Sequence, residues 1–288
     1  MEKLKKLIYS VYYLPENLIY SVKYLPQILF FGGLIIIFYT FFIAFYSYGQ
    51  STVMLAMVLE EGKEDSYLKM EKNWQKVNET AVAEGIITQW SVWKRTPREG
   101  DDGWAQYFVM MRRNAEQEDV FDKMTTSDWE QLSYRAFRGK SKKSIDKSLS
   151  TNGIVKEMRS RTYKLVVTTG WRGLEWEIGD KASFHYMTKK NDAFINYETS
   201  VWKPVAQKSI LEGYLKYWGI SELVDSNDVT KELKSTSTHI AFNFPTKKKN
   251  EEAYKVPEDF LGKKAWDALL NSREMLPAEE LTLVYSTF

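Results

Sequence analysis

Residues 162–202, TYKLVVTTGWRGLEWEIGDKASFHYMTKKNDAFINYETSVW, determine the fold class predicted from the sequence. The segments TYKLVVTT, LEWEI, KASFHYMT and AFINYETSVW are rich in aromatic and β-branched residues, which favour strands. Their separators GWRG, GD and KKND are typical of turns, and KKND (189–192) is the clearest hairpin. We therefore expect an antiparallel meander over this stretch.

Helical patterns lie on both sides of the expected meander. TSDWEQLSYRAF (126–137) begins with a capping-box pattern, and PVAQKSILEGYLKYWG (204–219) has proline at its start and glycine at its end. Another helix is expected over residues 257–273. Further strands are expected at 85–93, 104–111, 238–244 and 281–288. Because strands occur in runs with the helices set apart, we predict an α+β fold, with an antiparallel sheet that carries helices on one face.

An uncharged apolar run precedes this mixed region. ILFFGGLIIIFYTFFIAFYSY (28–48) has no charged side chain over 21 residues, enough for a helix to span about 30 Å of hydrocarbon. Lysines concentrate on its N-terminal side, so the sequence predicts a single-pass membrane protein with a cytoplasmic N-terminus and a periplasmic or other extracytoplasmic C-terminal domain.

The residues after this run retain a helix-favourable pattern. No proline occurs until residue 97, and apolar positions recur at three- and four-residue spacing, which predicts a stalk helix. The polar, basic stretch 139–153 is expected to be a mobile loop or a subdomain boundary. The predicted division is an interfacial tail (1–27), a transmembrane helix (28–48), the stalk helix (49–82) and an exterior α+β domain (83–288).

A tandem repeat occupies the predicted tail. LIYSVYYLPEN (7–17) and LIYSVKYLPQI (18–28) are identical at eight of eleven positions. Proline favours the first turn of a helix, and tyrosine and lysine favour the lipid headgroup region, so we expect two interfacial segments. The alternative is that each repeat packs on a neighbouring subunit. The residues assigned to the membrane interface are Lys3, Lys5, Lys6, Tyr9, Tyr13, Tyr20, Lys23 and Tyr24.

Composition excludes several classes of function. The chain has no cysteine, which rules out disulfides, thiolate metal sites and cysteine nucleophiles. Beyond residue 48 the basic and acidic side chains are equal in number, so nucleic acid is not an expected partner.

The sequence carries no recognisable motif for catalysis or ligand binding. The two histidines, His185 and His239, form no metal-binding pattern, and Gly139-Lys140-Ser141 lacks the glycine of a phosphate-binding loop. We therefore predict no catalytic residue, no cofactor, no metal and no small-molecule substrate. Glu175 and Glu177, which flank Trp176, and His185 serve as candidates if the chain is instead a hydrolase.

Tryptophan is unusually frequent, and exposed tryptophans concentrate at protein interfaces. The residues predicted to contact partners are Trp90, Trp93, Trp171 and Trp176.

The predicted function is that of a non-enzymatic, membrane-anchored scaffold subunit of a multi-protein assembly, in contact with other membrane-complex subunits and with lipids. A short tail, a single span, a stalk and an α+β domain form a layout similar in outline to inner-membrane components of type IV secretion and conjugation machines. The alternatives are an accessory subunit of a respiratory or photosynthetic membrane complex and a membrane-tethered envelope hydrolase.

Overall fold

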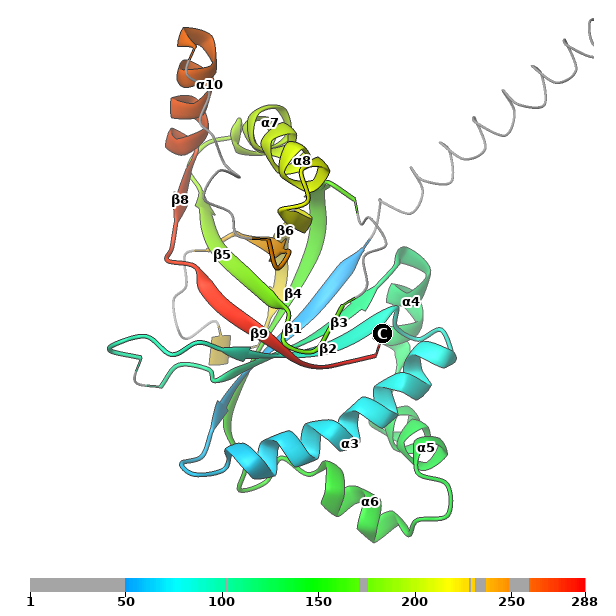
Figure 1. The fold of residues 1–288 in the computed structure, drawn as a ribbon. Helices are drawn as coiled ribbons and strands as arrows, with labels where there is room; N and C mark the ends of the chain where they lie inside the picture. The colour runs from blue at the N-terminus through cyan, green and yellow to red at the C-terminus, as the bar shows by residue number, and fades with distance from the viewer. Residues whose placement is uncertain are drawn as a thin grey trace, which may run out of the picture. The chain divides into compact units, whose positions relative to one another are not determined.

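A computed structural model describes residues 50–101, 103–170, 176–227, 229–230, 237–248 and 259–287. Its antiparallel strands pair in the order β7–β6–β4–β1–β3–β2–β9–β5, and β5 also pairs with β7, so that eight strands close into a barrel (Figure 1). The short β8 pairs with the C-terminal end of β5. The strands are β1 (Ser51–Leu59), β2 (Gln89–Arg95), β3 (Tyr107–Arg113), β4 (Val155–Thr168), β5 (Lys181–Lys189), β6 (Leu215–Ser226), β7 (His239–Pro245), β8 (Arg273–Met275) and β9 (Glu279–Ser286).

The barrel consists of two halves of equal topology. In the first half, β1 lies between β4 and β3, and β3 pairs with β2. In the second half, β5 lies between β9 and β7, and β7 pairs with β6. Each half therefore has the βαββαβ order of a ferredoxin-like unit. The β2–β9 and β4–β6 pairings join the two halves along both edges. Each of the eight barrel strands is therefore paired with a neighbour on both sides.

Helices cover the outside of the barrel in two groups (Figure 1). One group follows strands of the first half and the other follows strands of the second half. The first contains α3 (Glu64–Ala83), α4 (Ala115–Lys123), α5 (Thr126–Ala136) and α6 (Lys142–Leu149). The second contains α7 (Phe194–Tyr197), the π-helical turn η1 (Glu198–Trp202), α8 (Lys203–Leu211) and α10 (Phe260–Asn271).

This architecture corrects the predicted fold class. We expected an antiparallel sheet with helices on one face, preceded by a stalk and a membrane-spanning helix. The sheet instead closes on itself and carries helices on two sides. The closing pairs lie far apart in the sequence, as in Ser91 with Ser286, and local patterns carry no information about such pairs.

The predicted stalk helix (49–82) is also wrong over its first part. Residues 51–59 form β1, and α3 begins at Glu64 after a turn at Gly62, whose φ is 69°. STVMLAMVL is apolar on both faces, because one face points into the barrel and the other lies under α3. An apolar run of this kind fits a helix or a doubly buried strand, and strand pairing decides the outcome here.

Three expectations of local structure are also wrong. AFINYETSVW forms α7 and η1 rather than a strand, since Phe194 and Glu198 are buried at helical spacing. The helix expected over 204–219 ends at Leu211, and Gly213, with φ 79°, leads into β6. Residues 142–149 of the expected loop form α6, which buries Ile145 and Leu149.

Residues 1–49 lie outside the described part of the chain, and with them the predicted span at 28–48, the tandem repeat and all assigned interface residues. Among the helices described, none combines the length and the apolar character needed to cross a membrane.

Strand side chains alternate between two compartments. On β1, Met54 and Val58 point into the barrel, where they join a core of aromatic and aliphatic residues. Leu55 and Met57 point outward and pack under α3. A third core lies between the barrel and α8, where the buried Glu198 forms an ion pair with Arg273 of β8. The strand wall thus separates an interior core from two layers beneath helices.

Candidate functional site

A cavity of about 350 Å³ lies between α3 and the outward face of β1, β2 and β3. Its base is formed by buried residues, and its margin includes the exposed Met158 and Thr151. Ligand pockets in proteins typically measure about 300–1,000 Å³, so this cavity can hold one small organic molecule. The lining residues are Leu55, Met57, Met70, Glu71, Trp74, Asn78, Trp90, Val109, Met111, Phe121, Trp129, Thr151 and Met158.

Helix α3 supplies the polar groups of the cavity. Glu71, Trp74 and Asn78 are three and four residues apart, which places them on one face of the helix. Glu64 and Asp65 lie in the first turn, where acidic side chains offset the positive end of the helix dipole. The buried Tyr67, Val77 and Ala81 anchor the helix on the strands. A single helix therefore determines where the Glu71 and Asn78 side chains lie.

Glu71 is the titratable group of this cavity. Its side chain is buried, with 2% of the residue exposed. Burial raises the pKa of Glu71 from 4.5 to about 7, because a carboxylate loses its hydration there, while the adjacent Tyr67 hydroxyl acts in the opposite direction. Near neutral pH the carboxyl therefore exists in both protonation states, a condition suited to accepting and returning a proton.

Asn78 presents a hydrogen-bond acceptor to the cavity. Its Nδ2 donates to the Trp74 carbonyl oxygen at 2.9 Å. Its Oδ1 is buried and has no hydrogen-bond partner among the described residues. Because an unpaired buried acceptor costs about 1–3 kcal/mol, a ligand that donates to this oxygen would gain a favourable contact.

Aromatic rings form much of the cavity wall. The Trp74 indole Nε1 donates to the Leu149 carbonyl oxygen at 3.1 Å, which fixes the orientation of the ring. Phe121 of α4 and Trp129 of α5 meet edge to face, with centroids 5.6 Å apart. The Arg113 guanidinium stacks 4.3 Å from the Phe121 centroid. The wall thus favours a flat, apolar ligand.

A second carboxylate on α3, that of Glu64, has a lowered rather than a raised pKa. The Tyr107 hydroxyl donates to Glu64 Oε1 at 2.5 Å, and Lys94 Nζ lies 2.7 Å from the same oxygen. The contact with Lys94, followed by that with Tyr107, lowers the pKa of Glu64. Tyr107 also packs on Tyr67, with centroids 4.7 Å apart. Two carboxylates on one helix thereby differ in the direction of their pKa shift: the pKa of Glu64 is lowered and that of Glu71 is raised.

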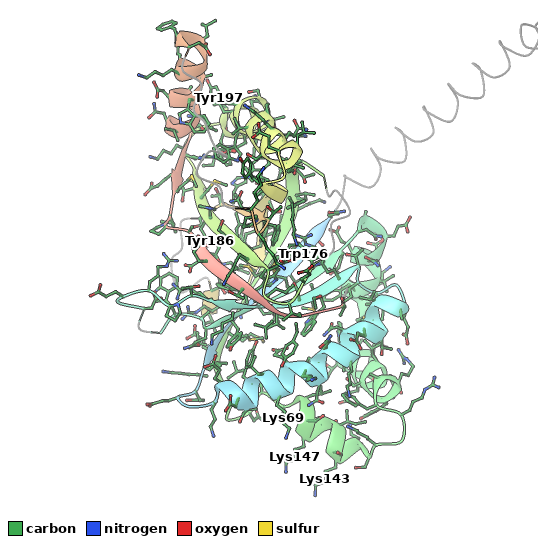
Figure 2. The ribbon with its side chains drawn as sticks, in the orientation of Figure 1. Lys69, Lys143, Lys147, Trp176, Tyr186 and Tyr197 are labelled. Atoms are coloured by element: carbon green, nitrogen blue, oxygen red, sulfur yellow. The ribbon has the colours of Figure 1, made fainter. Side chains whose placement is uncertain are left out.

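The tryptophans predicted to contact partners occupy different positions. Trp90 and Trp93 are each 1% exposed, so both pack within the chain's own cores rather than at a surface; Trp90 lines the cavity and Trp93 lies inside the barrel. Trp176 is partly buried against the barrel interior, which also contains Tyr186 (Figure 2). Its ring centroid is 4.5 Å from that of Phe244. Trp171 lies outside the described residues.

Glu177 and His185, two of the residues considered for hydrolysis, are not among the residues that line the cavity. Glu177 lies at the surface and forms an ion pair with Lys247, and Glu175 lies outside the described residues. His185 lies on β5, with its Nε2 3.3 Å from Ser183 Oγ. Burial, followed by the charge of Arg273, lowers the pKa of His185.

Sequence reasoning missed Glu71 and Asn78. A signal existed in the helical pattern, because both residues lie on the same face as the apolar Met70 and Trp74. Polar residues within an apolar helical stripe are buried unless the helix is exposed all round, and buried polar groups need a partner.

Comparisons with known proteins find similarity at the level of structure. No protein-family model matches the chain, and no curated protein matches it. A putative monooxygenase from Fusobacterium nucleatum has 10% identity and a TM-score of 0.49, covering 83% of this chain and 94% of its own. A putative monooxygenase from Lactobacillus acidophilus has 12% identity and a TM-score of 0.47, covering 83% and 95%. A mutant chlorite dismutase from Candidatus Nitrospira defluvii has 10% identity and a TM-score of 0.39, covering 83% and 92%. At these values the similarity concerns the fold and does not identify an activity.

These findings correct the predicted function. We predicted a non-enzymatic scaffold subunit from the layout of a stalk and an open sheet, and the closed barrel with its cavity does not have that layout. The chain itself has a cavity with a buried, titratable carboxyl. We therefore withdraw the scaffold, the respiratory or photosynthetic accessory subunit and the tethered envelope hydrolase. The predicted membrane-anchored localisation is withdrawn as well, because no described helix is long and apolar enough to cross a membrane.

Proposed function

We propose that this chain is an enzyme that binds a small hydroxylated aromatic molecule in the cavity beneath α3 and transfers a proton through Glu71. The observation that supports this proposal is the buried Glu71 carboxyl, whose pKa is about 7, in a cavity with aromatic walls. Perturbed carboxyls in enclosed apolar pockets are characteristic of acid–base catalysts.

The geometry assigns a role to each polar group. The unpaired Asn78 Oδ1 accepts a hydrogen bond from the ligand and orients it. The Glu71 carboxylate accepts a proton from the ligand, and the resulting neutral acid donates a proton to an adjacent ring carbon. The hydroxyl proton leaves and a proton arrives at carbon, so charge and atoms balance without any further reactant. Trp74, Trp90 and Trp129 flank the ring and exclude water.

Binding is tested first, with 2-naphthol and with naphthalene, which lacks the hydroxyl donor. We expect 2-naphthol to bind more tightly to the full-length protein, as measured by fluorescence titration. Asn78→Leu should weaken 2-naphthol binding about 5- to 10-fold, the value of one hydrogen bond, and leave naphthalene binding unchanged. Asn73→Leu is the matched control on the same helix, since Asn73 Nδ2 bonds to backbone oxygens of Lys69 and Ser148 outside the cavity lining.

Catalysis is tested by following deuterium exchange at C1 of 2-naphthol in heavy water by NMR. The wild-type protein should accelerate exchange, and Glu71→Gln should reduce the acceleration at least about 100-fold while it retains 2-naphthol binding. Equal exchange rates with and without protein would refute the enzymatic proposal. Failure of both arenes to bind, or equal weakening by the Asn73 and Asn78 substitutions, would refute the binding site.

A further inference from the structure

A row of carboxyl and hydroxyl groups extends from the cavity to the surface on one face of α3. Glu64, Tyr67 and Glu71 are three and four residues apart, so they lie on the same face and span about 10 Å of the helix. Glu71 lines the cavity and is 2% exposed, whereas the Glu64 side chain is 50% exposed. One end of the row is therefore buried beside the ligand, and the other end is in contact with water.

Tyr107 of β3 provides the outer link of this row. Its hydroxyl donates to Glu64 Oε1 at 2.5 Å, and its ring packs on that of Tyr67, with centroids 4.7 Å apart. Both tyrosines are fully buried. Lys94 Nζ lies 2.7 Å from the same Glu64 oxygen and favours the ionised carboxylate. A surface carboxylate is thus connected by a short hydrogen bond to a hydroxyl group in the core.

Tyr67 provides the inner link, next to Glu71. The Tyr67 hydroxyl lies close enough to the Glu71 carboxyl for each group to shift the pKa of the other. Tyr67 Oη is nevertheless buried without a hydrogen bond of normal geometry to any described residue. An unpaired buried hydroxyl costs about 1–3 kcal/mol, so its presence calls for an explanation. Its hydrogen rotates about the C–O bond and can point toward Glu71 or toward Tyr107.

We propose that Tyr67 and Tyr107 form a proton relay, which connects Glu71 with water at Glu64 while a ligand fills the cavity. This inference rests on the proposed function, in which Glu71 accepts and returns a proton. A proton from water arrives at Glu64 and passes to Tyr107, which gives its own hydroxyl proton to Tyr67. Tyr67 in turn gives its hydroxyl proton to Glu71. Each tyrosine gains one proton and loses one, so the net result is one proton moved from water to Glu71, and the reverse sequence removes it.

Both tyrosines stay neutral, as this role requires. Burial raises the pKa of Tyr67 well above its ordinary value. Burial, followed by the hydrogen bond to Glu64, also raises the pKa of Tyr107, and the charges of Tyr285 and Asp65 act in the same direction. Neither hydroxyl ionises near neutral pH, so each passes a proton on only as it receives another.

NMR of the full-length protein, with carbon-13 at the glutamate carboxyl carbons, tests the relay. The Glu71 signal is identified by its absence in Glu71→Gln. Naphthalene, which has no exchangeable proton, fills the cavity. At the pH of half-ionisation, about 7 for the wild-type protein, we expect one averaged Glu71 signal, because the relay exchanges the proton rapidly.

Tyr67→Phe and Tyr107→Phe should each slow this exchange at least about 100-fold and split the signal into those of the acid and the carboxylate. Both substitutions keep the ring, and Tyr107→Phe removes a hydroxyl bonded to Glu64 rather than to Glu71. A structural effect alone would therefore not split the signal in both variants. Tyr134→Phe, which removes a surface hydroxyl bonded to Lys142, is the matched control and should keep the averaged signal.

An averaged signal in both core tyrosine variants would overturn the relay. If naphthalene does not bind, the proposed binding site fails, and the same comparison in the empty cavity decides on the relay: split signals support it and averaged signals overturn it. The measurement follows no reaction of the ligand. Failure of the relay would therefore leave the catalytic proposal to its own deuterium-exchange test, and failure of that test would leave the relay measurement valid.

Discussion

Replacement of Glu71 by glutamine tests the electrostatic argument for the cavity directly. Glutamine has the shape of the protonated carboxyl and cannot ionise. The pKa of Glu71 rises from 4.5 to about 7 on folding, and a shift of this size corresponds to about 3 kcal/mol of unfolding free energy. Below pH 4.5 the carboxyl is protonated in both the folded and the unfolded state and contributes no difference. Between pH 4.5 and 7 the unfolded state loses its proton first, so the wild-type protein loses stability as the pH rises.

The expected result is a pH-dependent gain in stability for Glu71→Gln. Relative to the wild-type protein, its unfolding free energy should rise by about 3 kcal/mol between pH 4.5 and 8 and then remain constant. Urea denaturation, followed by tryptophan fluorescence at several pH values, measures this difference. A difference that does not change with pH would refute the assignment of a raised pKa to this carboxyl.

Glu64→Gln provides the matched control on the same helix. Lys94 and Tyr107 lower the pKa of Glu64, so this carboxylate stabilises the folded state above its ordinary pKa. The glutamine variant should therefore be less stable than the wild-type protein at neutral pH, and the difference should disappear as the pH falls. The two substitutions thus have opposite signs, which a general effect of removing negative charge from α3 would not produce.

Three further predictions concern stability and are checked by urea denaturation. Arg273→Met should lower the unfolding free energy by about 3–5 kcal/mol, because it leaves the buried Glu198 carboxylate unpaired. The additional substitution Glu198→Gln should restore most of this loss, and additive losses would contradict the prediction. Gly219→Ala should lower the unfolding free energy by about 1–3 kcal/mol, since the new Cβ would lie 2.3 Å from the Tyr217 hydroxyl oxygen. An unchanged urea midpoint would show that the Tyr217 ring moves freely. Asn114→Ala removes the capping box of α4 and should cost about 1 kcal/mol, with Asn114→Asp retaining most of the stability.

Local signals predicted several elements of the fold. The helix predicted over 126–137 is present as Thr126–Ala136, and the strand predicted over 238–244 is present as His239–Pro245. Both have strong local determinants, a capping box in the helix and a continuous buried run in the strand. The expected capping residue was Thr126 or Ser127, with Glu130 completing the box, whereas the structure has Thr125 as the capping residue and Asp128 completing the box.

The barrel and the site depend on contacts that local patterns do not contain. Closure requires β5 to pair with both β7 and β9, and the hairpin expected at residues 189–192 does not occur because β5 leads into α7. Glu71 is flanked by charged and polar neighbours in the sequence MEKNWQ, which is equally typical of an exposed helix. Its burial follows from the position of α3 on the closed barrel, and that position is a tertiary property.

The alternation of strand residues has a consequence for how this protein can diversify. Met110 and Met111 are neighbours in the chain, yet one belongs to the barrel core and the other to the ligand cavity. Substitutions at outward positions such as Leu55, Val109 and Met111 can therefore change what the cavity accepts without disturbing the packing inside the barrel. During evolution, the outward residue at every second strand position can therefore vary and change ligand preference, while purifying selection preserves the interior residues between them.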